Sequence, residues 1–305
     1  MRIASLIPSG TDLVVALGLG DSLVGVSHEC DHPQAAGLPV LTSSIIPPPN
    51  ADGPSIAPEE IDRLVASSIQ DGISLYRTNR ELLRELLPDV IITQDVCDVC
   101  AVSADAAQEL VCELSPGAQL VMLTATTTDG FLEDLRVLGA ALGAQAAAAE
   151  VERATRTALD AQRTLPATGK TMLALEWSDP PFLGGHWVPE LVELAGSQHV
   201  ISGAGAASRR ASWEEIAAAD PDVIVFCPCG YDLHQSSVEA QRLISRPAVA
   251  ALRAVREGRF FAVDANRLFS RCTTNLVEAC ELLRTLGTLE NGAETPNGAH
   301  RITTR

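Results

Sequence analysis

Cysteine and histidine side chains stand in short motifs that could bind a metal ion. The motifs are His28-Glu29-Cys30-Asp31, Cys97-x-x-Cys100 and Cys227-Pro-Cys229, and His186 follows a Gly-Gly pair. Thiolate and imidazole ligands suit zinc, iron and copper(I). The alternative is that individual cysteines only fill the core, because free cysteine is often buried. We expect a bound transition metal, zinc or iron, with the candidate ligands His28, Cys30, Cys97, Cys100, His186, Cys227 and Cys229.

The same motifs could instead supply a reactive thiol. Cys97-x-x-Cys100 follows a predicted strand, where a thioredoxin-like dithiol would stand. A cysteine nucleophile needs a lowered pKa, which a nearby imidazole or a helix N-terminus can provide. The spacing alone does not separate a dithiol from half of a zinc site. The candidate catalytic residues are Cys97, Cys100 and His28.

A second set of residues has the chemistry of a concave site for a small molecule. Aromatic rings offer flat apolar walls, and acidic, hydroxyl and guanidinium groups offer polar contacts. The alternative for Trp177 and Trp187 is that they fill the interior of a lobe. The chain has no phosphate-binding loop, no GxGxxG after its first strand and no GxSxG nucleophile motif. The candidate ligand-binding residues are Ser9, Glu29, Asp31, Tyr76, Asp95, Trp177, Asp179, Phe182, Trp187, Tyr231 and Arg271.

Most of these residues directly follow predicted strands. Helical segments separate the strands, and this alternation predicts a mostly parallel sheet, in which ligands bind at the carboxyl ends. The order of helix, PDVI strand and two-cysteine motif occurs twice, so we expect two similar α/β lobes. The strands are IASLI (3–7), LVGVS (23–27), DVIIT (89–93), QLVML (119–123), TMLALEW (171–177), the end of WEEIAAADPDVIVF (213–226) and FFAVD (260–264).

One segment near the middle of the chain, residues 129–165, predicts a long connecting helix. It has no proline, is rich in Ala, Leu, Glu and Arg, and carries apolar residues at helical spacing. The alternative is two ordinary helices broken near Gly143. The expected organisation is an N-terminal lobe (1–128), the connecting helix (129–165), a C-terminal lobe (166–290) and a disordered tail (291–305).

Composition and charge exclude several classes of protein. The 305 residues are 46% hydrophobic and 20% charged, which allows a sizeable core. The net charge of −17 argues against a nucleic-acid partner. The chain has no apolar run long enough to span a bilayer and no signal-peptide pattern at its start, so we expect a cytoplasmic protein.

Four stretches carry a family resemblance: SLIPSGTDLVVALGLGDSLVGVSHECDHP, LPDVIITQDVCDVCAVS, WEEIAAADPDVIVFCPCGY and VDANRLFSR. They resemble the cobalamin-binding members of the class III, or helical-backbone, periplasmic binding protein superfamily. HECD, DVCDVC and CPCG mark a narrower subgroup without an export signal. The resemblance covers residues 1–288 and implies two Rossmann-like lobes joined by one long rigid helix, with a ligand cleft between them.

The resemblance also implies a ligand and a partner. The implied ligand is cobalamin or another corrinoid, held in the cleft with little lobe motion. Exported relatives deliver such ligands to an ABC transporter and dock through an acidic residue on each lobe, for which this sequence shows no assigned counterpart.

Three functional hypotheses follow. The first is a cytoplasmic small-molecule-binding protein for a corrinoid or another metal chelate. The second is a cytosolic enzyme that reuses the fold with a Cys/His-rich metal or thiolate site in the cleft. The third is a domain that regulates or escorts a partner protein.

Overall fold

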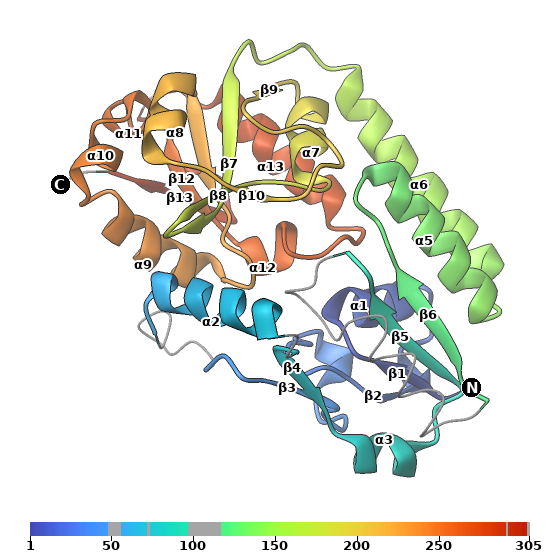
Figure 1. Ribbon diagram of the computed structural model, residues 1–305. Helices are drawn as coiled ribbons and strands as arrows, with labels where there is room; N and C mark the ends of the chain where they lie inside the picture. Colours follow the sequence, from blue (N-terminus) through green and yellow to red (C-terminus); the bar gives the residue numbers. More distant parts are fainter. Residues whose placement is uncertain (48–55, 72–73, 97–116, 291, 304–305) are drawn as a thin grey trace. The chain divides into compact units, whose positions relative to one another are not determined.

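The computed structural model describes residues 1–47, 56–71, 74–96, 117–290 and 292–303, and the chain divides into two compact units (Figure 1). The first unit holds Met1–Pro47, Arg63–Ala125 and Asp129–Ala154, and the second holds Pro48–Asp62, Thr126–Thr128 and Thr155–Arg305. Each unit is built on a sheet with parallel central strands flanked by helices. The α/β class with two parallel-sheet lobes, predicted from the alternation of strands and helices, is therefore confirmed.

The first unit contains the parallel sheet β2-β1-β5-β6. β1 is buried throughout and β5 for most of its length, as expected for strands covered on both faces. A separate antiparallel pair, β3 and β4, is absent from the strands predicted from the sequence. The elements are β1 Ile3–Ser5, α1 Pro8–Ala16, β2 Leu23–Gly25, β3 Thr42–Ser44, β4 Tyr76–Thr78, α3 Arg80–Leu86, β5 Val90–Gln94 and β6 Gln119–Leu123, with 3₁₀ turns at Gly20–Ser22 and Pro33–Ala35.

The second unit contains a mixed sheet in the order β10-β8-β7-β11-β12-β13, with β9 also paired to β7. β7, β11 and β12 run parallel, and β8, β10 and β13 join as antiparallel edges. The elements are β7 Thr171–Ser178, β8 Pro181–Leu183, α7 Val188–Leu194, β9 Gln198–His199, β10 Arg209–Arg210, α8 Trp213–Ala219, β11 Val223–Phe226, α9 Leu233–Leu243, α10 Pro247–Ala250, α11 Arg253–Arg256, β12 Phe260–Val263, α12 Ala265–Leu268, α13 Leu276–Thr288 and β13 Ala299–Ile302.

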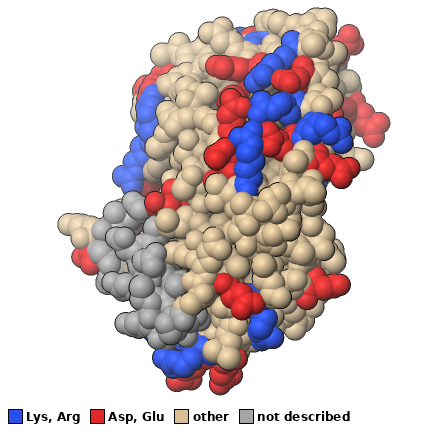
Figure 2. Space-filling view, turned by 90° about the vertical axis from the view of Figure 1, so that its right-hand side faces the viewer, with Lys and Arg blue, Asp and Glu red and all other residues tan. Residues whose placement is uncertain are grey.

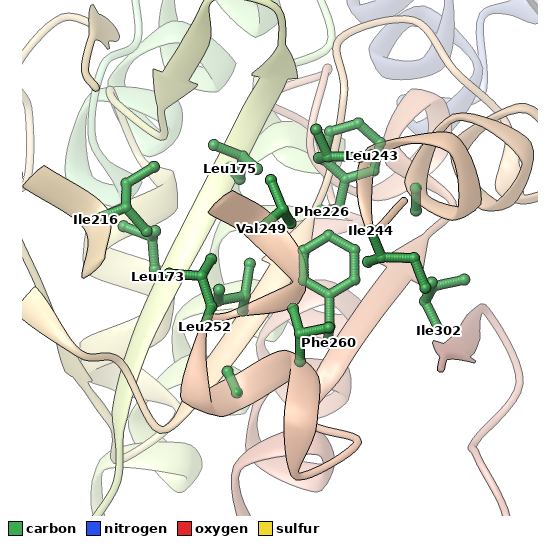
Figure 3. Packing of buried hydrophobic residues seen from close by; sticks show 14 of the residues in the cluster. Leu173, Leu175, Ile216, Phe226, Leu243, Ile244, Val249, Leu252, Phe260 and Ile302 are labelled. Carbon is green, nitrogen blue, oxygen red and sulfur yellow. The ribbon is translucent and has the colours of Figure 1, made fainter. Parts of the chain in front are cut away.

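The core of the second unit is formed where its parallel strands meet α9, α10 and α11 (Figure 3). Phe226 and Phe260 are fully buried, and their rings stack with centroids 6.2 Å apart. Leu173, Leu175 and Val249 belong to the same cluster. The apolar strands of the sequence are thus the interior of the sheet, and the polar motifs that follow them are left at its edge.

Two helices connect the lobes, where the sequence predicted one over 129–165. α5 spans Thr128–Ala141 and α6 spans Gln145–Arg163, so the single long helix is wrong and the break near Gly143 is present. Gly143 has φ +67°, a left-handed conformation that ends a helix readily only at glycine. α5 and α6 fold back on each other: Arg136 bonds Glu152, and a Cβ on Gly139 would collide with Ala148.

The segment predicted as a disordered tail contributes a strand. β13, Ala299–Ile302, pairs antiparallel with β12, and Ala299 and Ile302 are buried. A four-residue strand surrounded by polar residues has little local signal, because its stability comes from the partner strand. The prediction of disorder over 291–305 is therefore wrong for residues 299–302.

The first turn of α2, which spans Pro58–Asp71, belongs to the second unit, and the rest of the helix belongs to the first. The Trp177 indole donates to the Pro58 carbonyl at 3.2 Å, and Arg210 contacts Asp62 at 2.9 Å. These bonds attach the start of α2 to β7 and β10 of that unit.

Charged side chains of both signs lie next to each other on the face of the molecule shown in Figure 2. Surface ion pairs one helical turn apart include Arg136 with Glu133 and Arg163 with Asp160. Exposed pairs of this kind contribute little to stability. In the part of the chain that the structure describes, no helix is long and apolar enough to cross a bilayer.

Candidate functional site

Polar residues collect at the carboxyl edge of the first unit's sheet. Ser9 follows β1 at the start of α1, His28 follows β2, and Asp95 follows β5. Ser9 is buried, whereas Asp95 is exposed. Carboxyl ends of parallel strands meet at one edge, so the sequence prediction that these residues share an edge holds for this unit.

A hydrogen-bonded group at this edge surrounds His28. Its backbone N–H and its ring Nδ1 both meet Thr42 Oγ1, at 3.1 Å and 2.7 Å, and Thr42 donates to Ser27 Oγ at 3.0 Å. Thr42 belongs to β3, so the antiparallel pair that the sequence did not predict provides the ring's support. Burial lowers the pKa of His28, which favours the neutral imidazole.

Two further predicted residues, Tyr76 and Glu29, lie beside His28. The Tyr76 ring, from β4, has its centroid 5.8 Å from the imidazole. Glu29 Oε1 lies 4.0 Å from His28 Nε2. The half-buried Cys30 contacts Thr11 Oγ1 of α1 through its sulfur at 3.1 Å. Asp31, which follows Cys30, is exposed.

In the second unit, a series of contacts links residues that lie at or after the ends of three parallel strands. Trp177, at the end of β7, packs edge-on against Tyr231, which follows β11, with ring centroids 5.6 Å apart. The Tyr231 carbonyl accepts from the Asn266 backbone N–H at 2.8 Å, and Asn266 lies in α12 after β12. The Asn266 side chain accepts from the buried Arg271 guanidinium at 3.0 Å. The carboxyl edge thus brings together aromatic faces and a fixed cation.

The other predicted ligand-binding residues of this unit are Phe182, Asp179 and Trp187. Phe182 of β8 pairs across the strand with Trp177, and the Arg210 guanidinium lies 5.6 Å from its ring centroid. Asp179 is bound by Arg246 at 2.7 Å. Trp187 is only 8% exposed and contacts His186, so it behaves largely as an interior residue, which was the stated alternative.

The Gly184-Gly185 pair has a packing role. A Cβ on Gly185 would collide with the backbone of Ala206–Ser208, so only glycine allows that segment to pass. Glu176 accepts hydrogen bonds from the Gly185 N–H and from the Ser208 hydroxyl. These bonds hold Gly185 next to the segment that contains Ser208.

A buried carboxyl group that the sequence did not single out lies near Tyr231. Glu239 of α9 is 4% exposed, and burial raises its pKa above the ordinary 4.5 against the opposing effects of Ser178, Arg242 and Arg246. Within the described residues, Glu239 Oε2 and the Tyr231 hydroxyl have no hydrogen-bond partner. No local pattern distinguishes Glu239 from the surface acids of other helices, since its burial depends on how α9 packs.

The raised pKa predicts a pH-dependent effect of Glu239→Gln. Because the pKa of Glu239 is raised in the folded protein, its protonated form stabilises the fold. This stabilisation is fully present when the pH is below the pKa of the unfolded chain, near 4.5, and is lost as the pH rises through the pKa of the folded protein. We therefore expect Glu239→Gln to unfold at higher denaturant concentration than wild type at pH 8, with the gain vanishing near pH 4. Tryptophan fluorescence during guanidinium denaturation measures this. Glu281→Gln, at an exposed site of α13, is the control, and equal gains at both pH values would contradict the prediction.

The predicted metal ligands are not gathered into a metal centre in the described part of the chain. No group of three or more His, Cys, Asp or Glu side chains there could hold a metal ion. His28 and Cys30 belong to the first unit, and His186, Cys227 and Cys229 to the second. Cys97 and Cys100 lie outside the described residues.

Cys227 of the second unit does not have the properties of an activated thiol. Cys227 is 1% exposed, and burial raises its pKa well above the ordinary value, opposite to what a nucleophile requires. Cys229 is exposed. Two of the three candidate catalytic residues, Cys97 and Cys100, lie outside the described residues, and the enzyme hypothesis stays a prediction.

A pocket of about 470 Å³ opens elsewhere on the second unit. It lies near the amino end of β7 and is lined by residues such as Gln162, Glu193 and Arg284. Ligands of open parallel sheets bind at the opposite, carboxyl end. Arg284 is occupied by the carbonyls of Gln162, Pro166 and Leu194. We therefore assign this pocket a structural origin and keep the carboxyl edges as the candidate sites.

Comparison with known proteins identifies the class. The sequence model of the family described as "Periplasmic binding protein" matches residues 3–266. The chain is 24% identical over 290 residues to the vitamin B12-binding protein of Vibrio vulnificus (strain CMCP6), covering 92% of this chain and 89% of that protein. It is 23% identical over 294 residues to an uncharacterized ABC transporter substrate-binding lipoprotein, YvrC, of Bacillus subtilis (strain 168), covering 92% and 78%.

Solved structures show the same fold. A periplasmic heme binding protein from Pseudomonas aeruginosa matches with a TM-score of 0.71 and 20% identity, over 100% of this chain and 98% of that one. The periplasmic vitamin B12 binding protein BtuF of Vibrio cholerae matches with a TM-score of 0.65 and 22% identity, over 94% and 96%. The family match spans most of the sequence, so the chain belongs to the periplasmic binding protein family. The class III resemblance of the sequence is confirmed at this level.

Proposed function

We propose that this chain is the substrate-binding protein of an ABC transporter for a metal chelate of the corrinoid or haem type. The family match over residues 3–266 carries the proposal. The names of the relatives support the ligand class, because they include vitamin B12-binding and heme-binding proteins. The cytoplasmic location and the cleft between lobes stay predictions of the sequence.

The carboxyl edge of the second unit has suitable chemistry for such a ligand. A tetrapyrrole-like macrocycle presents a broad apolar face, which aromatic side chains such as Trp177 and Phe182 can cover. Its rim carries carboxylates in haem and amides and a phosphate in cobalamin. Arg271, held by Asn266, and Arg210, over the Phe182 ring, are guanidinium groups that can bind such oxygens.

The proposal is tested by titrating the purified protein with cyanocobalamin, aquacobalamin and ferric haem in a calorimeter. We expect saturable binding of at least one of them at one site per chain. If wild type binds none of the three, the proposed function is wrong.

Trp177→Ala tests the aromatic edge. We expect about tenfold weaker binding or more, because an aromatic contact contributes about 0.5–1.5 kcal/mol beyond its buried area and about 1.4 kcal/mol is tenfold in affinity. Trp177→Phe keeps a flat ring and is the matched control, with most of the affinity retained. If Trp177→Ala and wild type bound the ligand with equal affinity, the carboxyl edge of the second unit's sheet would not be part of the binding site.

A further inference from the structure

A closed ring of hydrogen bonds surrounds Ala174, where β7 changes its partner from β9 to β8. The imidazole of His199, at the end of β9, accepts the Ala174 N–H on Nε2 at 3.4 Å. Its Nδ1 meets the Ser202 carbonyl at 3.1 Å and the Ser202 hydroxyl at 3.2 Å. That hydroxyl donates to the Gly184 carbonyl at 2.7 Å, and the Gly184 N–H donates to the Ala174 carbonyl at 2.9 Å. The His199 side chain therefore takes the place of a strand residue between β9 and β8.

The backbone partners of the imidazole determine where its proton lies. A backbone N–H can only donate, so Nε2 must hold the lone pair that accepts from Ala174. A carbonyl can only accept, so Nδ1 must carry the proton that goes to Ser202. The neutral ring with its proton on Nδ1 is therefore the form that fits, and burial favours it, because His199 is 7% exposed.

A second proton on the imidazole would break this arrangement. Nε2 would then carry a hydrogen that faces the Ala174 N–H, and neither group could accept from the other. Ala174 is 0% exposed, so its N–H would lose the imidazole acceptor while it remained buried. A buried donor that loses its acceptor costs free energy, which opposes protonation as long as the segment stays in place.

The segment that follows His199 is held in a strained conformation. Ile201 has φ +77°, a left-handed conformation that is rare for a β-branched residue. The Ser202 hydroxyl fastens the segment, as does the Gly205 N–H, which donates to the His186 carbonyl at 2.8 Å. Backbone strain of this kind persists only while the surrounding contacts enforce it. The loss of one fastening at His199 therefore favours release of the segment.

We propose that His199 is an acid-sensitive latch for residues 200–206. At neutral pH the neutral imidazole fastens the start of this segment to β7. At acid pH a proton from solvent binds Nε2, the hydrogen bond from Ala174 breaks, and the segment leaves the strand. The latch is independent of the proposed function, because it needs no ligand.

The direction of the pH dependence follows from burial. Burial lowers the pKa of His199, and the hydrogen bond to the Ser202 carbonyl raises it by less. The stabilisation is therefore fully present above the pKa of the unfolded chain, near 6.5, and is lost as the pH falls through the lower pKa of the folded protein. The charged side chains on the elements packed around the imidazole are Lys170 and Glu176 at β7, Glu190 and Glu193 of α7, and Arg209 of β10.

The tautomer is read from a long-range ¹H–¹⁵N spectrum of the ¹⁵N-labelled wild type at about pH 7.5. We expect His199 to show a protonated Nδ1 and an unprotonated Nε2. His32, whose Nδ1 accepts the Gln34 N–H at 3.1 Å, should show the opposite tautomer and is the internal comparison. A proton on Nε2 of His199 at this pH would overturn the proposal.

Release of the segment is measured by amide hydrogen exchange of wild type between about pH 7.5 and about pH 5, relative to the intrinsic rate at each pH. We expect protection at Ala174 and at residues 200–206 to fall about tenfold or more, the effect of leaving a buried donor without its acceptor. Amides of β12 should keep their protection. Constant protection at Ala174, or an equal fall at every buried amide of the unit, would contradict a local latch.

Two variants assign the effect to the imidazole. His199→Gln places an acceptor that does not titrate near the position of Nε2, so protection at Ala174 should no longer depend on pH. His300→Gln changes an exposed histidine of the same unit and should behave as wild type. If His199→Gln kept the pH dependence of wild type, another group would cause it and the latch would be wrong. The tautomer and the exchange of wild type decide the proposal even if His199→Gln does not fold.

Discussion

Phe226→Ala is expected to lower the free energy of unfolding of the second unit by about 3–5 kcal/mol, the range for removing a fully buried phenylalanine. Phe226 is 0% exposed and ends β11, between β7 and β12. Its ring stacks on Phe260 at an interplanar angle of 20° (Figure 3). Hydrogen bonds to both neighbouring strands hold β11 in place, so the surroundings cannot close the cavity by moving the backbone.

Tryptophan fluorescence during guanidinium denaturation measures this loss specifically. The chain has three tryptophans, Trp177, Trp187 and Trp213, and all belong to the second unit. Phe226→Leu is the matched control, because it keeps an apolar side chain and should lose less than half as much. A loss below about 1.5 kcal/mol for Phe226→Ala would mean that the site repacks, contrary to a tightly packed core.

Arg259→Met is expected to cost about 3 kcal/mol or more, because several buried carbonyls lose a charged donor together. Arg259 is 7% exposed. Its guanidinium donates to the carbonyls of Leu286, Gly287 and Leu289 at the end of α13, at 2.8–3.3 Å, and to the Asp222 carbonyl at 3.2 Å. The last carbonyls of a helix have no partner within it, and a cation there also complements the helix dipole.

The same fluorescence measurement applies to Arg259→Met, with two comparisons. Arg259→Lys keeps the charge but has no planar fork to reach four carbonyls, so its loss should be intermediate. Arg256→Met changes an exposed arginine of α11 three residues away and should stay within about 0.5 kcal/mol of wild type. If Arg259→Met and Arg256→Met were equally stable, the carbonyls at the end of α13 would have found other partners, and the capping role would be wrong.

Elements with strong local patterns were predictable. The apolar strands over 3–7, 89–93, 119–123, 171–177, 223–226 and 260–264 correspond to β1, β5, β6, β7, β11 and β12. Continuous apolar runs between turn-forming residues indicate buried parallel strands without knowledge of their partners. The positions of His28, Asp95, Trp177 and Tyr231 after such strands follow from the same patterns.

Elements whose stability comes from distant partners were not predictable. β3 and β4 are short polar strands whose paired residues lie 32 to 36 positions apart in the sequence, and β13 depends on β12. The break between α5 and α6 needs Gly143 in a left-handed conformation, which the packing of Gly139 on Ala148 favours. A sequence with good helix propensity on both sides of a glycine is compatible with either outcome.

The sequence by itself therefore determined the α/β class, the order of the apolar strands along the chain and the loops in which the candidate functional groups lie. Only the tertiary structure decided what those groups can do. The His28 ring is held by a hydrogen bond with Thr42, from a strand absent from the predicted elements, and the burial of Glu239 and Cys227 depends on packing against other strands and helices. Local patterns report backbone conformation, whereas protonation and coordination depend on neighbours that folding brings from far along the chain.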